Sequence, residues 1–462
     1  IGTDAFQEVP TLDMVRPVTK ACFLVRDANE LWELIPKAFR IAESVRPGPV
    51  LIDVPKDVQM QVVPENPHSD SSLSREVGEG RGEGLHTFTD AWHLIESSER
   101  PVLYVGGGIV KSRSHHLVRE LAELIQAPVA TTLMALGTLP FDHPLNLGML
   151  GMHGARCTNR VIDECDLLIA IGARFDDRAT GRPDRFAPDA RVIHIDIDAR
   201  ELGKIRPPTL AIESDAGSAL RALIAHAHYR HRPQWIARVR ALKQSHPLQM
   251  PGVEKVCSPY GIVQAVGAVA PVDAILTTDV GQHQMWVAQA YPFQRPDRWL
   301  TSGGLGTMGF GLPAAIGAAI ARPDATVICF TGDGSLLMNI QELATLSELG
   351  LNVKIVLLDN AALGLVRQQQ TLFYGRRLVA SHFSQPGDFP GIAGAFGIPA
   401  IDLETCSAPH GTLSRALNGD GPILIRVPIG ADEHVLPMVA PGSGNVEAID
   451  HENHSDPISV SC

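Results

Sequence analysis

The fold is decided by one stretch of sequence, TVICFTGDGSLLMNIQELATLSELG, at residues 326–350. The apolar run at 327–330 is typical of a buried strand, the turn at 331–335 is rich in glycine, and a helical spacing of apolar residues follows over 336–349. A glycine turn between a strand and a helix presents free backbone N–H groups and the positive end of the helix dipole to an anion. The stretch therefore predicts an α/β unit with an anion site at its turn.

Two oxygen-bearing side chains follow neighbouring strands of this unit. Asp333 lies in the glycine turn, and Asn360 follows the next apolar run, 354–358, after a spacing of 27 residues. A strand–helix–strand unit places both strand ends side by side, and Mg²⁺ takes oxygen ligands. We therefore expect Asp333, Asn360 and a backbone carbonyl near Ala362 to hold Mg²⁺ beside a bound phosphate. The alternative is an ordinary glycine turn with Asp333 as a cap.

Strands and helices alternate in two long segments. Over 88–245, strand-like apolar runs occur at 101–105, 128–132, 166–171 and 192–197, and a helical pattern occurs at 115–125. Over 259–441, strand-like runs occur at 274–278, 326–331, 353–358 and 422–427. This alternation predicts an α/β fold of successive parallel-sheet domains with helices on both faces.

The remaining segments are short or polar. Residues 1–63 contain one amphipathic helix at 29–43 and one strand at 50–54, which is too little for a complete domain. Linkers are expected at 64–87 and 246–258, and the polar tail at 442–462 is expected to fray.

Composition argues against several classes of protein. Lys and Arg number 39 and Asp and Glu number 51, so the net charge of −12 argues against nucleic-acid binding. The seven cysteines form no CxxC pair, which favours reduced thiols in a cytoplasmic chain over a disulfide framework or a zinc site. We recognise neither an apolar run long enough for a membrane span nor a signal peptide. The chain begins at Ile1 rather than Met, which predicts a fragment of a longer protein.

Longer blocks resemble the large, catalytic subunits of acetolactate synthase (acetohydroxyacid synthase), a family of thiamine-diphosphate enzymes. In that family the GDG turn, here 332–334, is followed by a pair of asparagines, and this chain has Asp359 and Asn360 at that place. The resemblance covers nearly the whole chain apart from the linker and the tail. Its other blocks are IGTDAFQE (1–8), RPGPVLIDVPKDVQ (46–59), GMLGMHG (148–154), GARFDDR (172–178), TTDVGQHQMW (277–286) and TSGGLGTMGFGLPAAIGAA (301–319).

The resemblance implies three domains in chain order. They are a pyrimidine-binding domain, of which 1–63 is the C-terminal part, a middle FAD-binding domain at 88–245, and a diphosphate- and Mg²⁺-binding domain at 259–441. The implied cofactors are thiamine diphosphate, Mg²⁺ and FAD.

The resemblance also implies roles for individual residues. Gln7, Lys56 and Met308 are expected in the catalytic site, Met308 under the thiamine cofactor, although core packing is the alternative for Met308. Phe6 and Gln369 are expected near the substrate. Contacts with thiamine diphosphate are expected from Gly281, Gln282, His283, Gly332, Gly334, Ser335 and Leu365. Contacts with FAD are expected from Arg46, Gly106, Gly107, His153, Gly172, Arg174, Asp176, Arg178, Asp196 and Asp215. Most of the FAD positions follow strands, where charged residues also serve as helix caps or form ion pairs.

The implied reaction begins with pyruvate, which loses carbon dioxide on the thiamine cofactor. The two-carbon unit passes to a second pyruvate or to 2-ketobutyrate, an early step of branched-chain amino-acid synthesis. A homodimer or higher oligomer and a small regulatory subunit are the implied partners. The family's catalytic glutamate belongs to the first half of the pyrimidine domain, which this chain does not contain, so we expect the isolated chain to be inactive.

Three features of the last domain concern substrate and cofactor preference. Asp359 replaces an asparagine of the family, and its charge is expected to weaken diphosphate binding. Gln369 stands where many members have Trp, which resembles the first isozyme of enterobacteria and predicts a weak preference between the two acceptors. The segment 364–375 is expected to form a mobile lid over the site.

Other functions remain open at this point. Another thiamine-diphosphate enzyme, such as a pyruvate oxidase or a glyoxylate carboligase, would share the cofactor motif but not the IGTDAFQE and GQHQMW blocks. A non-catalytic flavin-binding or assembly protein would fit a chain without the catalytic glutamate. An NAD-dependent enzyme is disfavoured because the glycines after the first strand of the middle domain, Gly106, Gly107 and Gly108, do not form GxGxxG, and because the GDG turn is followed by Asn360.

Overall fold

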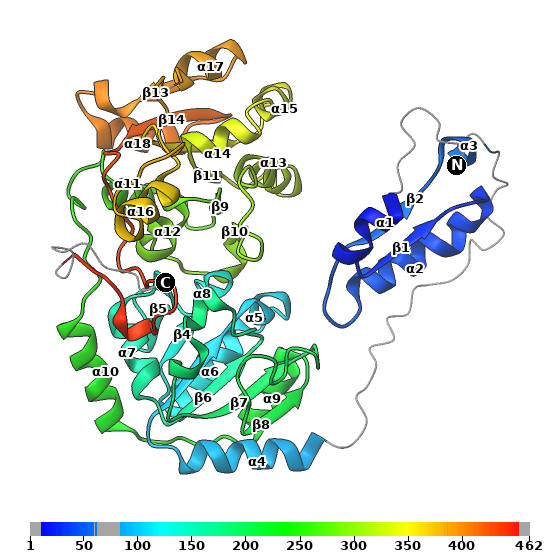
Figure 1. The fold of residues 1–462 in the computed structure, drawn as a ribbon, viewed down its shortest axis with the longest axis vertical. Coiled ribbons are helices and arrows are strands. Elements are labelled where there is room, and N and C mark those ends of the chain that lie inside the picture. Colours follow the sequence, from blue (N-terminus) through cyan, green and yellow to red (C-terminus); the bar gives the residue numbers. More distant parts are fainter. Residues whose placement is uncertain (1–10, 60, 62–83, 386, 452–462) are drawn as a thin grey trace. The chain divides into compact units, whose positions relative to one another are not determined.

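The computed structural model describes residues 11–59, 61, 84–385 and 387–451 (Figure 1). The chain divides into two compact units, one made mainly of residues 1–84 and the other of most of residues 85–462.

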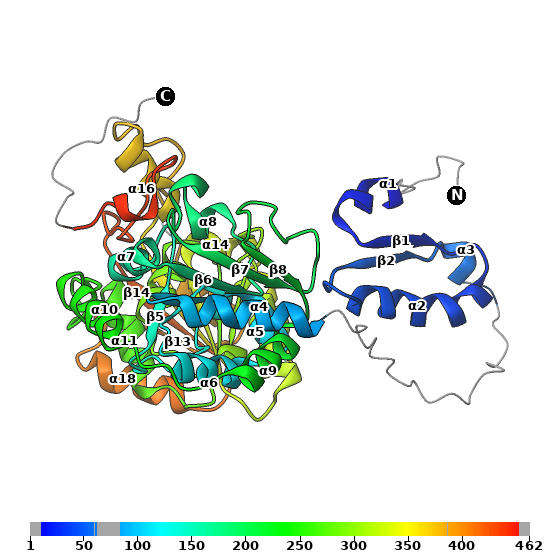
Figure 2. The same cartoon turned by 90° about the horizontal axis from the view of Figure 1, so that it is seen from below.

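The first unit is built around two parallel strands. Strand β1 (Ala21–Leu24) pairs with β2 (Val50–Asp53), with Ala21 opposite Val50. Helix α2 (Leu31–Glu43) lies on one face of this pair and α1 (Thr11–Val15) on the other, and α3 (Lys56–Gln59) follows β2 (Figure 2). The predicted helix and strand are confirmed, but β1 was not predicted.

The first six-stranded sheet is parallel throughout and has the order β5-β4-β3-β6-β7-β8. Its chain order reverses between β3 and β6, as in doubly wound sheets that bind ligands at that crevice. The strands are β3 (Pro101–Val105), β4 (Val129–Thr131), β5 (Asn146–Met149), β6 (Leu167–Ile171), β7 (Arg191–Asp196) and β8 (Leu210–Glu213). The helices are α4 (Gly84–Ser97), α5 (Gly107–Lys111), α6 (His115–Ile125), α7 (Arg156–Glu164), α8 (Asp177–Thr180), α9 (Ala216–His226) and α10 (Pro233–Ser245).

The second six-stranded sheet is also parallel and has the order β10-β9-β11-β12-β14-β13. Its order reverses between β9 and β11. The strands are β9 (Ile275–Thr278), β10 (Trp299–Thr301), β11 (Val327–Gly332), β12 (Val353–Asp359), β13 (Ala400–Asp402) and β14 (Ile423–Pro428). The helices are α11 (Pro259–Val269), α12 (Gln282–Ala290), α13 (Gly311–Ala321), α14 (Asp333–Met338), α15 (Glu342–Glu348), α16 (Gly364–Phe373), α17 (Phe389–Ala395) and α18 (Pro409–Asn418).

Apolar cores cover both faces of each large sheet. In β11, Ile328 and Phe330 belong to one core, whereas Val327 and Cys329 belong to another. This alternation on a fully buried strand explains its continuous apolar sequence, because side chains of successive residues point to opposite faces. The predicted α/β class with parallel sheets is confirmed.

Several sequence predictions differ from the structure. The helix expected over 336–349 is broken into α14 and α15, since Asn339 leaves the helix and donates a side-chain hydrogen bond of 2.6 Å to the carbonyl of Gly309. Helix α4 begins at Gly84, inside the predicted linker 64–87; residues 64–83 of that linker lie outside the described residues. The short strands β5, β8, β10 and β13 were not predicted.

The segment after Gly442 is not frayed as far as the structure describes it. Asn445 donates a side-chain hydrogen bond of 2.8 Å to the carbonyl of Ala179, and Glu447 pairs with Arg185. These contacts tie residues 443–450 to the α7–α8 region of the first large sheet. The rest of the predicted tail, 452–462, lies outside the described residues.

Two further expectations concern cysteines and membranes. The six cysteines within the described ranges are free thiols. Among the helices that the structure describes, none has both the length and the apolar character required to cross a bilayer.

Candidate cofactor site

A cavity of about 210 Å³ lies in the second large sheet where the order of its strands reverses. Open α/β sheets bind ligands at such a point because the loops that follow the two neighbouring strands leave on opposite faces and open a crevice. Its walls come from the loops after β9, β11 and β12 and from the start of α16. The lining residues are Val280, Gly281, Gln282, His283, Trp286, Gly306, Met308, Gly332, Asp333, Gly334, Ser335, Leu358, Asn360, Ala362, Leu363, Gly364, Leu365, Val366 and Ile429.

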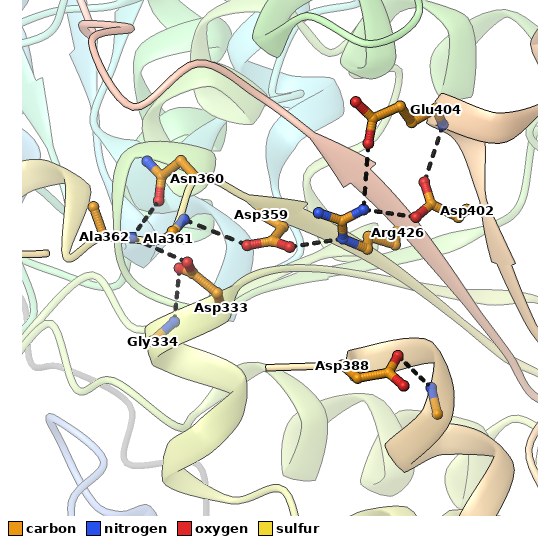
Figure 3. Close-up of polar contacts among 11 residues, drawn as sticks. Asp333, Gly334, Asp359, Asn360, Ala361, Ala362, Asp388, Asp402, Glu404 and Arg426 are labelled. Atoms are coloured by element: carbon orange, nitrogen blue, oxygen red, sulfur yellow. Dashed lines mark hydrogen bonds and ion pairs between the residues drawn. The ribbon is translucent and has the colours of Figure 1, made fainter. Parts of the chain in front are cut away.

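The predicted metal ligands lie together in this cavity (Figure 3). Asp333, at the start of α14, accepts hydrogen bonds from the backbone N–H groups of Gly334 (2.8 Å) and Ala362 (3.1 Å). Asn360 Oδ1 also accepts from the N–H of Ala362, at 3.2 Å. The turn after β12 is therefore folded onto the glycine turn after β11, and the side-chain oxygens of Asp333 and Asn360 converge.

This donor set suits a hard divalent cation. The described part of the chain holds no cluster of three or more His, Cys, Asp and Glu side chains that could bind a metal. Asp333 and Asn360 instead combine one carboxylate with one amide oxygen, and Mg²⁺ commonly takes only one or two carboxylates together with phosphate oxygens and water.

The electrostatics of Asp333 also favour a cation. Burial raises the pKa of Asp333 to about 7; the backbone N–H groups of Gly334 and Ala362 oppose the rise, and the charge of Asp359 adds to it. A buried carboxylate without a cation thus resists ionisation, and a bound divalent ion would favour the charged form.

Asp359 has an arginine partner that sequence reasoning did not foresee. Its side chain is 4% exposed, and Oδ2 accepts a hydrogen bond of 2.7 Å from Arg426 Nε. Arg426 Nη1 also lies 2.6 Å from Asp402 Oδ2 and 3.6 Å from Glu404 Oε2 (Figure 3). Arg426 therefore places a positive charge beside Asp359, which it shares with Asp402 and Glu404.

The turn after β9 supplies two more polar groups. Gln282 Oε1 accepts from Asn360 Nδ2 at 3.2 Å, and Gln282 Nε2 donates to Gln368 Oε1 at 2.9 Å. His283 Nε2 is buried and has no hydrogen-bond partner among the described residues. Burial lowers the pKa of His283 to about 4, so the ring is neutral near pH 7.

Two glycines of the cavity wall leave little space for a side chain. A Cβ at Gly332 would lie 2.9 Å from His283 Nδ1, and one at Gly334 would lie 2.6 Å from Leu363 Cδ2. A helix start, an unpartnered histidine nitrogen and converging oxygens together fit a diphosphate bridged by a cation. The residues present thus fit thiamine diphosphate with Mg²⁺.

Met308 is held in the opposite wall by a carboxylate. Asp279, 1% exposed, accepts hydrogen bonds from the backbone N–H groups of Val280 (2.8 Å), Gly309 (2.8 Å) and Gly311 (2.7 Å). The bonds from Gly309 and Gly311 fix the loop directly after Met308. Sequence reasoning missed Asp279, although its position directly after an apolar strand was a usable signal.

Two neighbouring glutamines of helix α16 differ in burial. Gln368 is fully buried and exchanges hydrogen bonds with the backbone of Val435 at 2.8 and 2.9 Å. Gln369, the predicted substrate residue, is exposed and does not line the cavity. Sequence reasoning missed Gln368, since nothing in the run of three glutamines shows which one faces inward.

The residues predicted from the N-terminal blocks either lie outside the described residues or belong to the first compact unit. Gln7 and Phe6 lie outside the described residues. Lys56 begins α3, and Arg46 follows α2, where its carbonyl accepts a hydrogen bond of 3.1 Å from Lys20 Nζ.

The FAD residues predicted in the middle domain follow strands of the first large sheet, and several have structural roles there. Gly106 follows β3 and Gly172 follows β6; a Cβ at Gly106 would lie 2.2 Å from the carbonyl oxygen of Gly172, so close backbone packing requires glycine. Asp176 caps α8 and Asp215 caps α9 through side-chain hydrogen bonds.

The remaining predicted FAD residues differ in position and in exposure. Gly107 begins α5, and Asp196 ends β7. His153 is buried, with Nδ1 3.1 Å from the carbonyl of Pro437, whereas Arg174 and Arg178 are exposed.

Two threonine hydroxyl groups at the end of β4 are buried without a hydrogen-bond partner among the described residues. They belong to Thr131 and Thr132.

Comparisons with known proteins agree with this geometry. Residues 279–427 match the family model described as thiamine pyrophosphate enzyme, C-terminal TPP binding domain, and residues 88–223 match that of the thiamine pyrophosphate enzyme central domain. The first range contains all cavity-lining residues except Ile429, and the second contains all six strands of the first large sheet.

Full-length relatives give a narrower match. The chain is 51% identical to the acetolactate synthase isozyme 1 large subunit of Escherichia coli (strain K12), over 97% of this chain and 79% of that protein. It is 44% identical to the acetolactate synthase large subunit of Parasynechococcus marenigrum (99% of this chain, 75% of that protein) and 43% identical to the E. coli isozyme 2 large subunit (97% and 81%). The chain therefore belongs to the acetolactate synthase large subunits, a family of thiamine pyrophosphate enzymes.

Proposed function

We propose that the cavity of the second large sheet binds thiamine diphosphate with Mg²⁺ and that the protein forms acetolactate from pyruvate. The observation that carries this proposal is the convergence of Asp333, Asn360 and the unpartnered His283 Nε2 in one cavity. Its lining contains every residue predicted from the motifs of the last domain except Gln369.

The chain's own residues bind and orient the cofactor. Asp333, Asn360 and a carbonyl near Ala362 would hold Mg²⁺, and the N–H groups at the start of α14 together with His283 would face the diphosphate. Met308 would pack against the cofactor and exclude water. Thiamine diphosphate, when bound, supplies the carbon that takes up the two-carbon unit and the ring that accepts the electron pair left by carbon dioxide.

The finer assignments are also part of the proposal. The acceptor would be a second pyruvate or 2-ketobutyrate, with Gln369 and Phe6 near it and Gln7 and Lys56 in the catalytic site. FAD would lie at the reversal point of the first large sheet, near Arg174 and Arg178. The relatives are named large subunits, and we propose a homodimer or higher oligomer with a small regulatory partner.

Acetolactate formation tests this proposal. Pyruvate, thiamine diphosphate, Mg²⁺ and FAD are supplied to the 462-residue chain, and to the same chain joined to the part of the E. coli isozyme 1 large subunit that precedes the aligned residues. The family resemblance assigns the catalytic glutamate to that part, so acetolactate is expected from the joined protein. Absence of acetolactate from both proteins would contradict the proposed reaction.

Two measurements refine the assay. Addition of 2-ketobutyrate should give the mixed product in comparable amount, because Gln369 predicts a weak preference. The Asp333→Asn variant of the active protein should lose activity. This loss would distinguish acetolactate formation in the cavity from background conversion of pyruvate.

A further inference from the structure

Two buried carboxylates stand side by side at the metal end of the cavity. Asp333 and Asp359 are 3% and 4% exposed, and the charge of Asp359 acts on Asp333. A diphosphate would bring further negative charge to the same place. Like charges in a site of low dielectric repel strongly, so an acidic residue directly before Asn360 requires a compensating cation.

Arg426 is placed to provide this compensating positive charge. It lies on β14 beside β12, where Arg426 is the register partner of Leu357, and it reaches Asp359 through Nε at 2.7 Å. The hydrogen bonds and charges of Asp359 and Asp402 outweigh the effect of burial and raise the pKa of Arg426, which therefore remains charged.

Asp359 also connects Arg426 to the turn that carries Asn360. Its second oxygen, Oδ1, lies 3.4 Å from the backbone N–H of Ala361. Ala361 has a φ of +51°, in the left-handed region that a residue with a side chain rarely adopts, so this turn depends on the contacts around it.

We propose that Arg426 is a positioning residue of the cofactor site: it neutralises Asp359 and, through Asp359, holds the 360–362 turn that presents Asn360 to the metal. This inference rests on the proposed use of the cavity for thiamine diphosphate and Mg²⁺. The alternative is that Arg426 only ties β13 to β14, through Asp402, its register partner on β13.

Calorimetric titration with thiamine diphosphate in excess Mg²⁺ distinguishes the two roles. Wild type, Arg426→Met, Asp359→Asn and the double variant are compared, and thermal unfolding of each is recorded. Arg322→Met is the matched control, because Arg322 forms a surface ion pair with Asp324 at 3.0 Å.

A positioning role predicts dependence on Asp359. Arg426→Met should weaken thiamine diphosphate binding at least tenfold when residue 359 is Asp, and less than threefold when it is Asn. Asp359→Asn alone should bind within threefold of wild type or more tightly, because its amide oxygen can still accept from the N–H of Ala361 and no charge is left to neutralise. Arg322→Met should bind within threefold of wild type. If Arg426→Met does not fold, the comparison between Asp359→Asn and the double variant still distinguishes the positioning role from the structural role.

Three results would overturn the proposal. Unchanged binding in a folded Arg426→Met would show that Arg426 has no role at the cofactor. A tenfold loss in the double variant relative to Asp359→Asn would show a structural role independent of Asp359. No binding of thiamine diphosphate by wild type would overturn the proposed function itself and this inference with it, and is thereby distinguished from the first two.

Discussion

Gln282 Nε2 donates a hydrogen bond of 2.9 Å to Oε1 of Gln368, which joins the wall of the cofactor cavity to helix α16. Because Gln368 is in turn bonded to both backbone groups of Val435, the pair also connects the cavity to the C-terminal segment. The cavity wall, the helix next to it and this segment therefore form one buried hydrogen-bonded network.

Gln368→Leu should destabilise the protein by about 2–3 kcal/mol, because it leaves buried backbone groups of Val435 without partners. Urea unfolding measures the loss. Gln369→Leu on the same helix is the control and should change stability by less than about 0.5 kcal/mol, because residue 369 is exposed. Equal effects of the two substitutions would contradict the assigned orientation of α16.

Asp279→Asn should lower stability by about 2–4 kcal/mol. An amide cannot accept the three backbone hydrogen bonds that the buried carboxylate receives, and its NH₂ group would face a backbone N–H. The thermal midpoint of the variant is compared with that of Asp273→Asn, an exposed aspartate before β9 that should have no measurable effect. A midpoint equal to wild type would mean that Asp279 does not hold the Met308 loop.

Met308→Ala should weaken thiamine diphosphate binding about tenfold, since about 1.4 kcal/mol of apolar contact corresponds to that factor. Its fold should remain intact because the side chain lies in a cavity wall rather than in the core. Leu305→Ala, in the same loop but 95% exposed, is the control and should bind normally. The prediction fails if Met308→Ala lowers the melting temperature while the affinity is unchanged.

Acid should destabilise the protein through His153. Burial lowers its pKa from 6.5 to about 4, so between these values the unfolded chain binds a proton that the folded chain does not. Stability from this group is therefore complete above pH 6.5 and decreases as the pH falls towards 4, by about 2 kcal/mol at pH 5.

Unfolding free energies at pH 7 and pH 5 measure this effect. His153→Asn should reduce the difference between the two, whereas His410→Asn, exposed on α18, should not. If the unfolding free energy falls by the same amount between pH 7 and pH 5 in His153→Asn and in wild type, the acid sensitivity belongs to other groups.

Local patterns predicted most of the last domain. The GDG turn could be found because strand, turn and helix are contiguous, and Asn360 because one helical crossover separates its strand from that turn. The same reasoning predicted the buried strands β11 and β12, whose apolar runs are continuous.

Contacts between distant residues could not be predicted. Arg426 is 67 residues from Asp359, and Gln368 is 86 residues from Gln282, so no local pattern joins them. The break between α14 and α15 follows from the bond of Asn339 to Gly309, which lies 30 residues earlier. Edge strands such as β13 are short, and their residues are only half-buried. Their apolar pattern is therefore too weak to be recognised in the sequence.

The central claim is that Asp333 holds the metal through which a diphosphate is bound in the cavity. The most direct test is calorimetric titration of thiamine diphosphate into wild type and Asp333→Asn, with Mg²⁺ and with the metal removed by chelator. Asp388→Asn is the control, because Asp388 is an exposed cap of α17 and asparagine caps helices equally well. We expect binding by wild type and Asp388→Asn only with Mg²⁺, and at least a hundredfold weaker binding by Asp333→Asn. Equal affinity without Mg²⁺, or in Asp333→Asn, would contradict the claim.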